Sequence, residues 1–306
     1  MRVAAVDLGT NSTRLLVADV QDERVEEVAR QSEITRLGEG VDERRKLLPL
    51  PVARVRNVLS DYRREAERLG AERVLTIGTS AVRDAENGEA FLGEIEWSYG
   101  FTTRLLSGEE EAELTRRGVA NGRAVGDETV VLDVGGGSTE LITSGERTSI
   151  DVGSVRLTER HLHSDPPSPE ELDAARSAVR DALPKLEPRA AIGVAGTVTT
   201  LAALELGGYD PDTVHGHRLS REAVELQLER LASLPLSERR ELPGLEPERA
   251  PVIVGGAVIV SEVLRRYRLA TLEVSERDIL HGAALEAATL PPVEEGDAPP
   301  GAYTCC

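Results

Sequence analysis

Hydrophobic and polar positions follow two different periods along the first half of the chain. Residues 3–8 and 13–20 are almost continuously apolar and predict two buried strands, and 25–36 predicts a third. Between residues 50 and 69 the apolar positions recur at helical spacing until Gly70, which predicts a helix that stops at this glycine. The same criteria predict strands at 72–78 and 102–106, a helix at 88–98, and a further helix that opens at Ser107.

The second half begins after the polar, glycine-containing stretch 121–128, which we take as a boundary. Residues 129–143 predict two strands joined by a glycine turn, followed by a strand at 146–153 and a helix at 170–183. Residues 191–204 and 251–264 each predict a strand, a glycine turn and a helix.

These elements predict two α/β lobes, residues 1–124 and 125–290. Residues 291–306 are rich in Pro, Gly and acidic residues, which predicts a disordered tail. Because hairpins accompany the helices, we expect mixed sheets instead of the uniform parallel sheet of a dinucleotide-binding fold. We also expect an interdomain cleft between the two lobes. The chain has no G-x-x-x-x-G-K-[ST] motif, and neither of its two lysines, Lys46 and Lys185, lies in a glycine loop. A P-loop mechanism is therefore excluded.

One arrangement of residues occurs twice, 126 positions apart. Each time, an apolar strand ends at an acid and a loop of glycine, hydroxyl and amide residues follows: Asp7 with Gly9, Thr10, Asn11 and Ser12, and Asp133 with Gly135, Gly136, Gly137, Ser138, Thr139 and then Glu140. Exposed N–H groups of such loops bind anions, and an acid at the strand end is suited to Mg²⁺. A simple hairpin would explain either loop alone, but the repetition favours two loops that together clamp a chain of phosphates.

Residues 105–114, LLSGEEEAEL, contain two neighbouring acids with different interpretations. Ser107 and Glu110 form a capping box, so Glu110 has a structural explanation. Glu111 is not needed for capping and is a candidate general base. Arg83 follows a buried strand and a Gly-Thr-Ser turn, so we consider two roles for it: contact with a phosphate, or a surface ion pair with Asp84.

Two other motifs are weaker. His215 and His217 in VHGH are spaced like metal ligands, but no third ligand is nearby in the sequence and we favour a structural role. Residues 193–197, GVAGT, open a predicted helix and are compatible with an anion site or with close packing of the helix on the strand.

Composition limits the possible partners and compartments. The 306 residues are 40% hydrophobic but only 3% aromatic, and the net charge of −18 argues against a nucleic-acid binder. The only cysteines, Cys305 and Cys306, are adjacent, so they build neither a disulfide framework nor a metal site. We see no signal peptide, and the longest apolar stretch, 251–264, is too short to span a membrane. We therefore expect a cytoplasmic protein without membrane partners.

Taken together, these motifs resemble the exopolyphosphatase / guanosine pentaphosphate phosphohydrolase (Ppx/GppA) family, in its short two-domain form. Eight segments occur in the order of the family between about residues 3 and 285: VDLGTNSTRLLVADV, IGTSAVRDAEN, SGEEEAEL, LDVGGGSTELI, GSVRLTE, GVAGTVTTLAAL, ERAPVIVGGAVIV and VSERDILHGAAL. The resemblance implies two actin-like (ribonuclease H-like) lobes and, usually, a homodimer.

The resemblance also implies residue roles. Glu111 matches the catalytic base that activates water, and Arg83 matches an arginine that reaches the phosphates. Asp133 and Glu140 match the acids on either side of the second phosphate loop, and Asp7 to Ser12 match the first. The implied ion is Mg²⁺, held by Asp7, Asp133 and Glu140.

Four functions remain to be ranked. The first is an exopolyphosphatase that releases terminal orthophosphate from inorganic polyphosphate, with short chains preferred, and the second is a guanosine pentaphosphate 5′-phosphohydrolase. The third is a nucleotide-switched actin-like binding protein, and the fourth is a sugar kinase. We rank hydrolysis first, because the SGEEEA segment favours water as the acceptor, and we take polyphosphate as the first substrate and guanosine pentaphosphate as the alternative. The fold alone does not decide the function.

Overall fold

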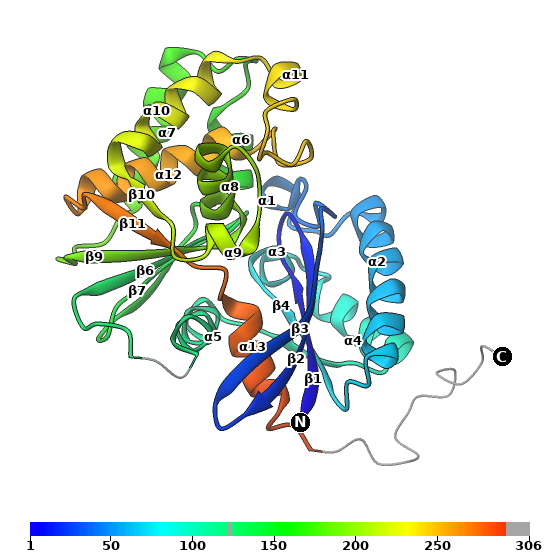
Figure 1. Ribbon diagram of the computed structural model, residues 1–306. Coiled ribbons are helices and arrows are strands. Elements are labelled where there is room, and N and C mark those ends of the chain that lie inside the picture. The colour runs from blue at the N-terminus through cyan, green and yellow to red at the C-terminus, as the bar shows by residue number, and fades with distance from the viewer. Residues whose placement is uncertain (122–123, 292–306) are drawn as a thin grey trace. The chain divides into compact units, whose positions relative to one another are not determined.

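The computed structural model describes residues 1–121 and 124–291, and the chain forms two compact units (Figure 1). The first unit comprises Met1–Ala124 together with Ile279–Cys306, and the second comprises Val125–Asp278. The expected tail at 291–306, with Cys305 and Cys306, lies almost entirely outside the described residues.

The first unit is built on a five-stranded mixed sheet. Its strands are β1 (Arg2–Leu8), β2 (Thr13–Gln21), β3 (Arg24–Glu33), β4 (Val74–Gly78) and β5 (Thr102–Leu105), in the order β3-β2-β1-β4-β5. β1, β2 and β3 are antiparallel neighbours, whereas β4 and β5 continue the sheet parallel to β1. Its helices are α1 (Val41–Arg44), α2 (Pro49–Arg68), α3 (Ser80–Asp84), α4 (Gly88–Tyr99), α5 (Gly108–Ala120) and α13 (Ile279–Ala287).

Both faces of this sheet are covered, which explains why β1 reads as an unbroken apolar run. Ala4 and Val6 point to one face and pack with residues of α2 and α4. Val3 and Ala5 point to the other face and pack with residues of α13 and with Leu114 of α5.

The second unit repeats the order of the first four strands and has two further strands beside the fourth. Its strands are β6 (Thr129–Val134), β7 (Thr139–Ile142), β8 (Arg147–Ile150), β9 (Ala190–Val194), β10 (Arg218–Ser220) and β11 (Thr271–Val274), in the order β10-β11-β9-β6-β7-β8. Its helices are α6 (Ser154–His161), α7 (Pro169–Ala182), α8 (Ala195–Leu206), α9 (Pro211–Val214), α10 (Arg221–Ser233), α11 (Leu236–Arg239) and α12 (Ile253–Arg266). In both units the third, second, first and fourth strands lie side by side in that order; in the second unit β11, the sixth strand, lies next to the fourth, and β10, the fifth, forms the edge. The shared order confirms the predicted ribonuclease H-like α/β fold.

Two sequence predictions differ from the structure. Residues 251–264 do not form a strand and a turn, because Ile253–Arg266 is the single helix α12. The last helix, α13, was expected in the second lobe but packs within the first unit, against α5 and β1. Among the described residues, no helix is both long enough and apolar enough to cross a membrane.

Candidate active site

The two glycine loops have the same backbone geometry. In the first loop, residues 9–12, the Gly9 N–H donates to the Ser12 carbonyl at 3.0 Å, and in the second loop, residues 135–138, the Gly135 N–H donates to the Ser138 carbonyl at 3.1 Å. A Cβ at Gly9 would lie 2.9 Å from the Ser12 oxygen, and one at Gly135 would lie 3.1 Å from the Ser138 oxygen. Glycine is therefore needed at both positions to let the turn close.

Each loop is held from outside by the segment that follows the third strand of its unit. In the first unit, the N–H groups of Arg36 and Gly38 donate to the carbonyls of Asn11 and Thr10, each at 2.8 Å. In the second unit, the start of α6 has this role: Ser154 N–H donates to the Gly135 carbonyl at 2.9 Å, and Val155 N–H donates to the Gly136 carbonyl at 2.8 Å.

These contacts engage the carbonyl groups of the loops and leave amide groups for a ligand. Within the described residues, the N–H groups of Thr10 and Asn11 donate to no backbone acceptor, and neither do those of Gly136 and Gly137. Consecutive amides of this kind form an anion-binding concavity. Both loops are therefore suited to phosphate, each within its own unit.

The acid before each loop has a different neighbour in the two units. Asp7 pairs across the strands with Arg14, and their carboxylate and guanidinium lie 2.6 Å apart in a buried ion pair. Asp133 pairs across the strands with Glu140, and the exposed fractions of these two residues are 6% and 1%. Directly opposite residues point to the same face of a sheet. The second loop thus has two buried carboxylates side by side where the first has an ion pair.

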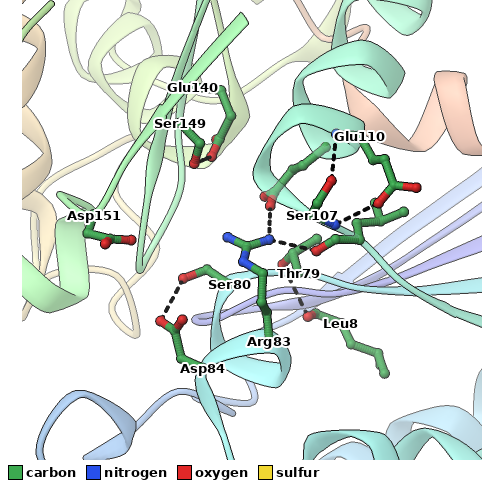
Figure 2. A network of polar contacts seen from close by, with 12 residues as sticks. Leu8, Thr79, Ser80, Arg83, Asp84, Ser107, Glu110, Glu140, Ser149 and Asp151 are labelled. Atoms are coloured by element: carbon green, nitrogen blue, oxygen red, sulfur yellow. Dashed lines mark hydrogen bonds and ion pairs between the residues drawn. The ribbon is translucent and has the colours of Figure 1, made fainter.

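Arg83 and Glu111, 28 residues apart in sequence, form an ion pair in the first unit. Arg83 extends from α3, and its Nη1 donates to Glu111 Oε2 at 3.0 Å and to the Leu106 carbonyl at 2.8 Å (Figure 2). Glu111 is 8% exposed. The structure therefore brings together the two residues that the sequence suggested for catalysis, and a neighbouring guanidinium favours the ionised carboxylate that a general base needs.

Glu110 points back to the start of its helix, as the capping box predicts. Its carboxylate accepts the Ser107 N–H at 2.8 Å, and its own N–H donates to the Ser107 hydroxyl (Figure 2). The carboxylate also pairs with Arg104. The Ser107 N–H and then Arg104 lower the pKa of Glu110 from its usual value to about 2. Glu110 is thus fully ionised and engaged at neutral pH, whereas Glu111 is oriented separately.

The Ppx/GppA phosphatase family model matches residues 16–289. The chain belongs to the Ppx/GppA phosphatase family.

Relatives and solved structures agree with this membership. The chain is 40% identical to "Exopolyphosphatase 2" of Mycobacterium tuberculosis, over 94% of this chain and 98% of that protein. It is 28% identical to a "Guanosine-5'-triphosphate,3'-diphosphate pyrophosphatase" of Photobacterium profundum, of which it covers 58%. The structure of the Aquifex aeolicus PPX-GPPA enzyme matches with a TM-score of 0.80 and 31% identity, over 94% of this chain and 99% of that chain.

One pair of carboxylates in this Ppx/GppA phosphatase fits a divalent cation. Glu140 Oε1 accepts the Ser149 hydroxyl at 2.8 Å (Figure 2). Two adjacent buried carboxylates repel each other, and a cation bound to both relieves this repulsion, so Asp133 and Glu140 fit Mg²⁺. Asp7 fits less well, because Arg14 already balances its charge. The described residues contain no group of three or more His, Cys, Asp or Glu side chains suited to a metal. A cation at Asp133 and Glu140 would therefore need water and phosphate oxygens as its other ligands, as Mg²⁺ commonly does.

The hydroxyl of Thr139 has an internal partner. Thr139 is fully buried, and its Oγ1 donates to the Val152 carbonyl at 2.5 Å. Thr13, 126 positions earlier, is also buried, and its hydroxyl contacts that of Thr35 at 2.9 Å. Each threonine therefore ties the strand after its loop to the segment that holds the loop.

The histidines of VHGH contact protein groups. His215 Nδ1 accepts the Glu276 N–H at 3.2 Å, and His217 Nε2 lies 3.1 Å from Glu205. GVAGT spans the end of β9 and the start of α8, and a Cβ at Gly193 would lie 2.9 Å from Val198 of α8, which supports close packing of the helix on the strand there.

Sequence reasoning missed Arg14 and the start of α6. A signal for Arg14 was present, since it follows Asp7 by the same seven positions by which Glu140 follows Asp133. The signal for α6 was Gly153, the residue directly before this helix. A Cβ at Gly153 would lie 2.4 Å from the Gly136 carbonyl, so only glycine lets the start of α6 approach the second loop this closely.

Proposed function

We propose that this Ppx/GppA phosphatase is an exopolyphosphatase, which hydrolyses the terminal phosphoanhydride bond of inorganic polyphosphate and releases orthophosphate. One observation carries the proposal: the buried carboxylate of Glu111 lies at the start of α5 and pairs with Arg83, whereas Ser107 and Glu110 form the helix cap. The 40% identity to the mycobacterial exopolyphosphatase supports this substrate over others.

In the proposed reaction, the Glu111 carboxylate accepts a proton from a water molecule, which attacks the terminal phosphorus. The phosphoanhydride bond breaks, and the shortened chain leaves with the bridging oxygen. Before substrate arrives, the Arg83 guanidinium stabilises the ionised carboxylate of Glu111. When Arg83 then contacts a phosphate oxygen, its interaction with Glu111 weakens and the basicity of the Glu111 carboxylate rises.

In this proposal, the amides of both loops, Gly9 to Ser12 and Gly135 to Ser138, bind phosphate oxygens. Asp133 and Glu140 would hold Mg²⁺. When bound, the ion neutralises charge on the phosphates. We assign Thr139 and Asp7 to supporting roles, because their side chains already bond to Val152 and Arg14.

The deciding experiment compares orthophosphate release from polyphosphate and from guanosine pentaphosphate, with and without Mg²⁺. We expect release from polyphosphate that depends on Mg²⁺ and has the higher kcat/KM. A higher kcat/KM for guanosine pentaphosphate would establish the alternative function, a guanosine pentaphosphate 5′-phosphohydrolase. The 28% identity to the Photobacterium enzyme is the support for this alternative. No release from either substrate would refute the proposal.

The proposal includes a cytoplasmic homodimer without nucleic-acid or membrane partners. Its support is the family resemblance and the net charge of −18. Sedimentation equilibrium of the full chain measures the oligomeric state directly.

A further inference from the structure

Residues 44–46 form a basic run that the proposed reaction does not use. Arg44-Arg45-Lys46 is the sequence's single stretch of three consecutive basic residues, in a chain with a net charge of −18. All three residues are exposed. Most arginines of this protein pair with acids, but in the described part of the chain the side chains of Arg44 and Arg45 form no hydrogen bond or ion pair with protein groups. The Lys46–Glu86 contact is 3.7 Å long and exposed on both sides, so it is weak.

The basic run belongs to a segment that contacts both the first glycine loop and the helix bearing Arg83. The segment that contains it begins at Arg36 and Gly38, whose N–H groups hold the first loop. It continues through α1, which packs against α3, the helix that bears Arg83 (Figure 1).

The far end of the segment is anchored next to the same helix. The Glu86 N–H donates to the Arg45 carbonyl at 2.8 Å, and Asn87 exchanges two hydrogen bonds with the backbone of Leu47. The backbone of the run is therefore fixed between the first loop and the residues that follow Arg83, while its charged ends stay in solvent.

Another exposed basic cluster has a structural explanation that the basic run lacks. Arg266 and Arg268 lie at the carboxyl end of α12, a helix of 14 residues, where positive charge stabilises the helix terminus. α1 has only four residues, so its dipole gives little reason for Arg44 and Arg45. Two neighbouring cations without acidic partners keep their full charge available for an anion.

We propose that Arg44, Arg45 and Lys46 form a binding site for the part of a phosphate chain that lies beyond the terminal, reacting phosphate. This inference rests on the proposed hydrolysis of phosphoanhydrides. The run recognises closely spaced phosphate charges, a chemistry shared by the inner phosphates of polyphosphate and by the 3′-diphosphate of guanosine pentaphosphate. It raises affinity for substrates that extend past the terminal phosphates and leaves the chemical step unchanged.

The test compares wild type with R44A/R45A, and uses R266A/R268A as the matched control with the same loss of charge. The substrates are tripolyphosphate, polyphosphate of about fifteen phosphates and guanosine pentaphosphate, and the dissociation constant of the fifteen-phosphate chain is measured in parallel by calorimetry. For R44A/R45A we expect a rise in KM and Kd of roughly tenfold for the fifteen-phosphate chain, the effect of losing one or two phosphate contacts. We expect less than about a twofold change for tripolyphosphate, and an unchanged kcat.

The charge-retaining variant R44K/R45K should keep most of the wild-type affinity, and the difference between wild type and R44A/R45A should shrink as salt is added. A Kd for the fifteen-phosphate chain that is equal in wild type and R44A/R45A overturns the inference, as does an equal loss in R266A/R268A. Failure of the proposed function is a separate result: wild type then releases no phosphate, while calorimetry still decides whether the basic run binds the chain. A KM change seen with only one of the two longer substrates identifies which one the run serves.

Discussion

Glu110 and Glu111 are chemically identical neighbours that the start of α5 directs to different partners. Successive helical positions point in directions about 100° apart. Glu110, at the third helical position, turns back to Ser107 and Arg104, whereas Glu111 turns to Arg83. One carboxylate therefore stabilises the helix terminus, and the other is held, buried, for chemistry.

Glu111→Gln should lower kcat by about 10²–10⁴-fold, the usual contribution of a general base. The amide cannot accept the proton from water, yet it keeps the size of the side chain, so substrate binding should persist. Steady-state release of orthophosphate measures the effect. Glu110→Gln is the matched control and should retain turnover; if it abolishes turnover while Glu111→Gln does not, the base has been assigned to the wrong carboxylate.

Thr139→Val should lower the free energy of unfolding by about 1–3 kcal/mol, because the buried carbonyl of Val152 loses its donor. Thr139→Ser keeps the hydroxyl and should recover most of that loss. Urea unfolding gives the stabilities, and KM and kcat are measured on the same samples. A Thr139→Val protein of wild-type stability with a raised KM would instead show that this hydroxyl binds phosphate, as its position beside the glycine loop in the sequence suggests.

The individual acids were accessible from sequence, but their partners were not. The capping box identified Glu110 correctly because the rule involves residues only three positions apart. The Arg83–Glu111 pair depends on how α3 and α5 pack around β4 and β5, and local sequence offered Asp84 as an equally reasonable partner for Arg83. Sequence thus located the candidate residues, whereas their pairing required the fold.

At the level of elements, local pattern predicted most helices and strands and failed where glycines had another function. In 251–264, Gly255 and Gly256 suggested a turn. In the structure they lie inside α12 at its contacts with α6 and α8: a Cβ at Gly255 would lie 2.6 Å from Thr158 Oγ1, and one at Gly256 would lie 2.5 Å from Thr197 Cγ2. Close helix packing, which sequence does not show, explains both glycines.

Gly255→Ala should destabilise the protein by about 1–3 kcal/mol through overpacking, although alanine is the better helix former. Because α6 also holds the second loop, we expect a raised KM in the same variant. Gly93, in α4, is the control, since an added Cβ there meets nothing within 4 Å. Gly93→Ala should be neutral or stabilise by up to about 1 kcal/mol, and thermal unfolding of both variants tests the contrast. Equal stabilities of the two variants would contradict the packing explanation.

The cap of α5 should make a pH-dependent contribution to stability. The pKa of Glu110 falls from 4.5 to about 2 on folding, so its stabilising effect is complete above about pH 4.5 and is lost as the pH falls toward 2. Glu110→Gln removes the charge and with it this dependence. In urea unfolding between pH 7 and pH 3, the stability difference between wild type and Glu110→Gln should be constant above pH 5 and shrink below it. A difference that stays constant down to pH 3 would show that Glu110 contributes through its hydrogen bonds alone.

At the scale of the whole molecule, one architecture is used twice with different charges. The units share the order of their first four strands, the closure of the glycine loop and a threonine that anchors the segment holding the loop. The first unit adds Arg14, Arg83 and Glu111, whereas the second adds the Asp133–Glu140 pair. The repeated sequence pattern predicted the shared fold, because strands and turns follow local rules. The division of charge between the units follows from single residues at equivalent positions.

The overall charge leads to a prediction about chain length. We expect low processivity, with products that form a ladder of successively shortened chains. Each bound phosphate slows dissociation, but the basic run supplies only three cations, and the surrounding surface belongs to a protein with a net charge of −18. That surface repels the distal part of a long chain, more strongly at low salt than at physiological salt, where the screening length is about 8 Å.

The measurement is kcat/KM, per mole of chain, for polyphosphates from about three to several hundred phosphates at two ionic strengths, with products resolved by gel electrophoresis. Beyond the length that the basic run can reach, kcat/KM should stop rising, because further phosphates meet no cation of the run. The ratio of kcat/KM for chains of several hundred phosphates to kcat/KM for chains of about fifteen should increase with added salt. Screening weakens the repulsion between the acidic surface and the distal part of a long chain more than it changes the binding of the shorter chain. The opposite pattern would be only full-length substrate and orthophosphate, with long chains preferred at low salt. It would require an extended basic track on the enzyme, which Arg44, Arg45 and Lys46 alone do not provide.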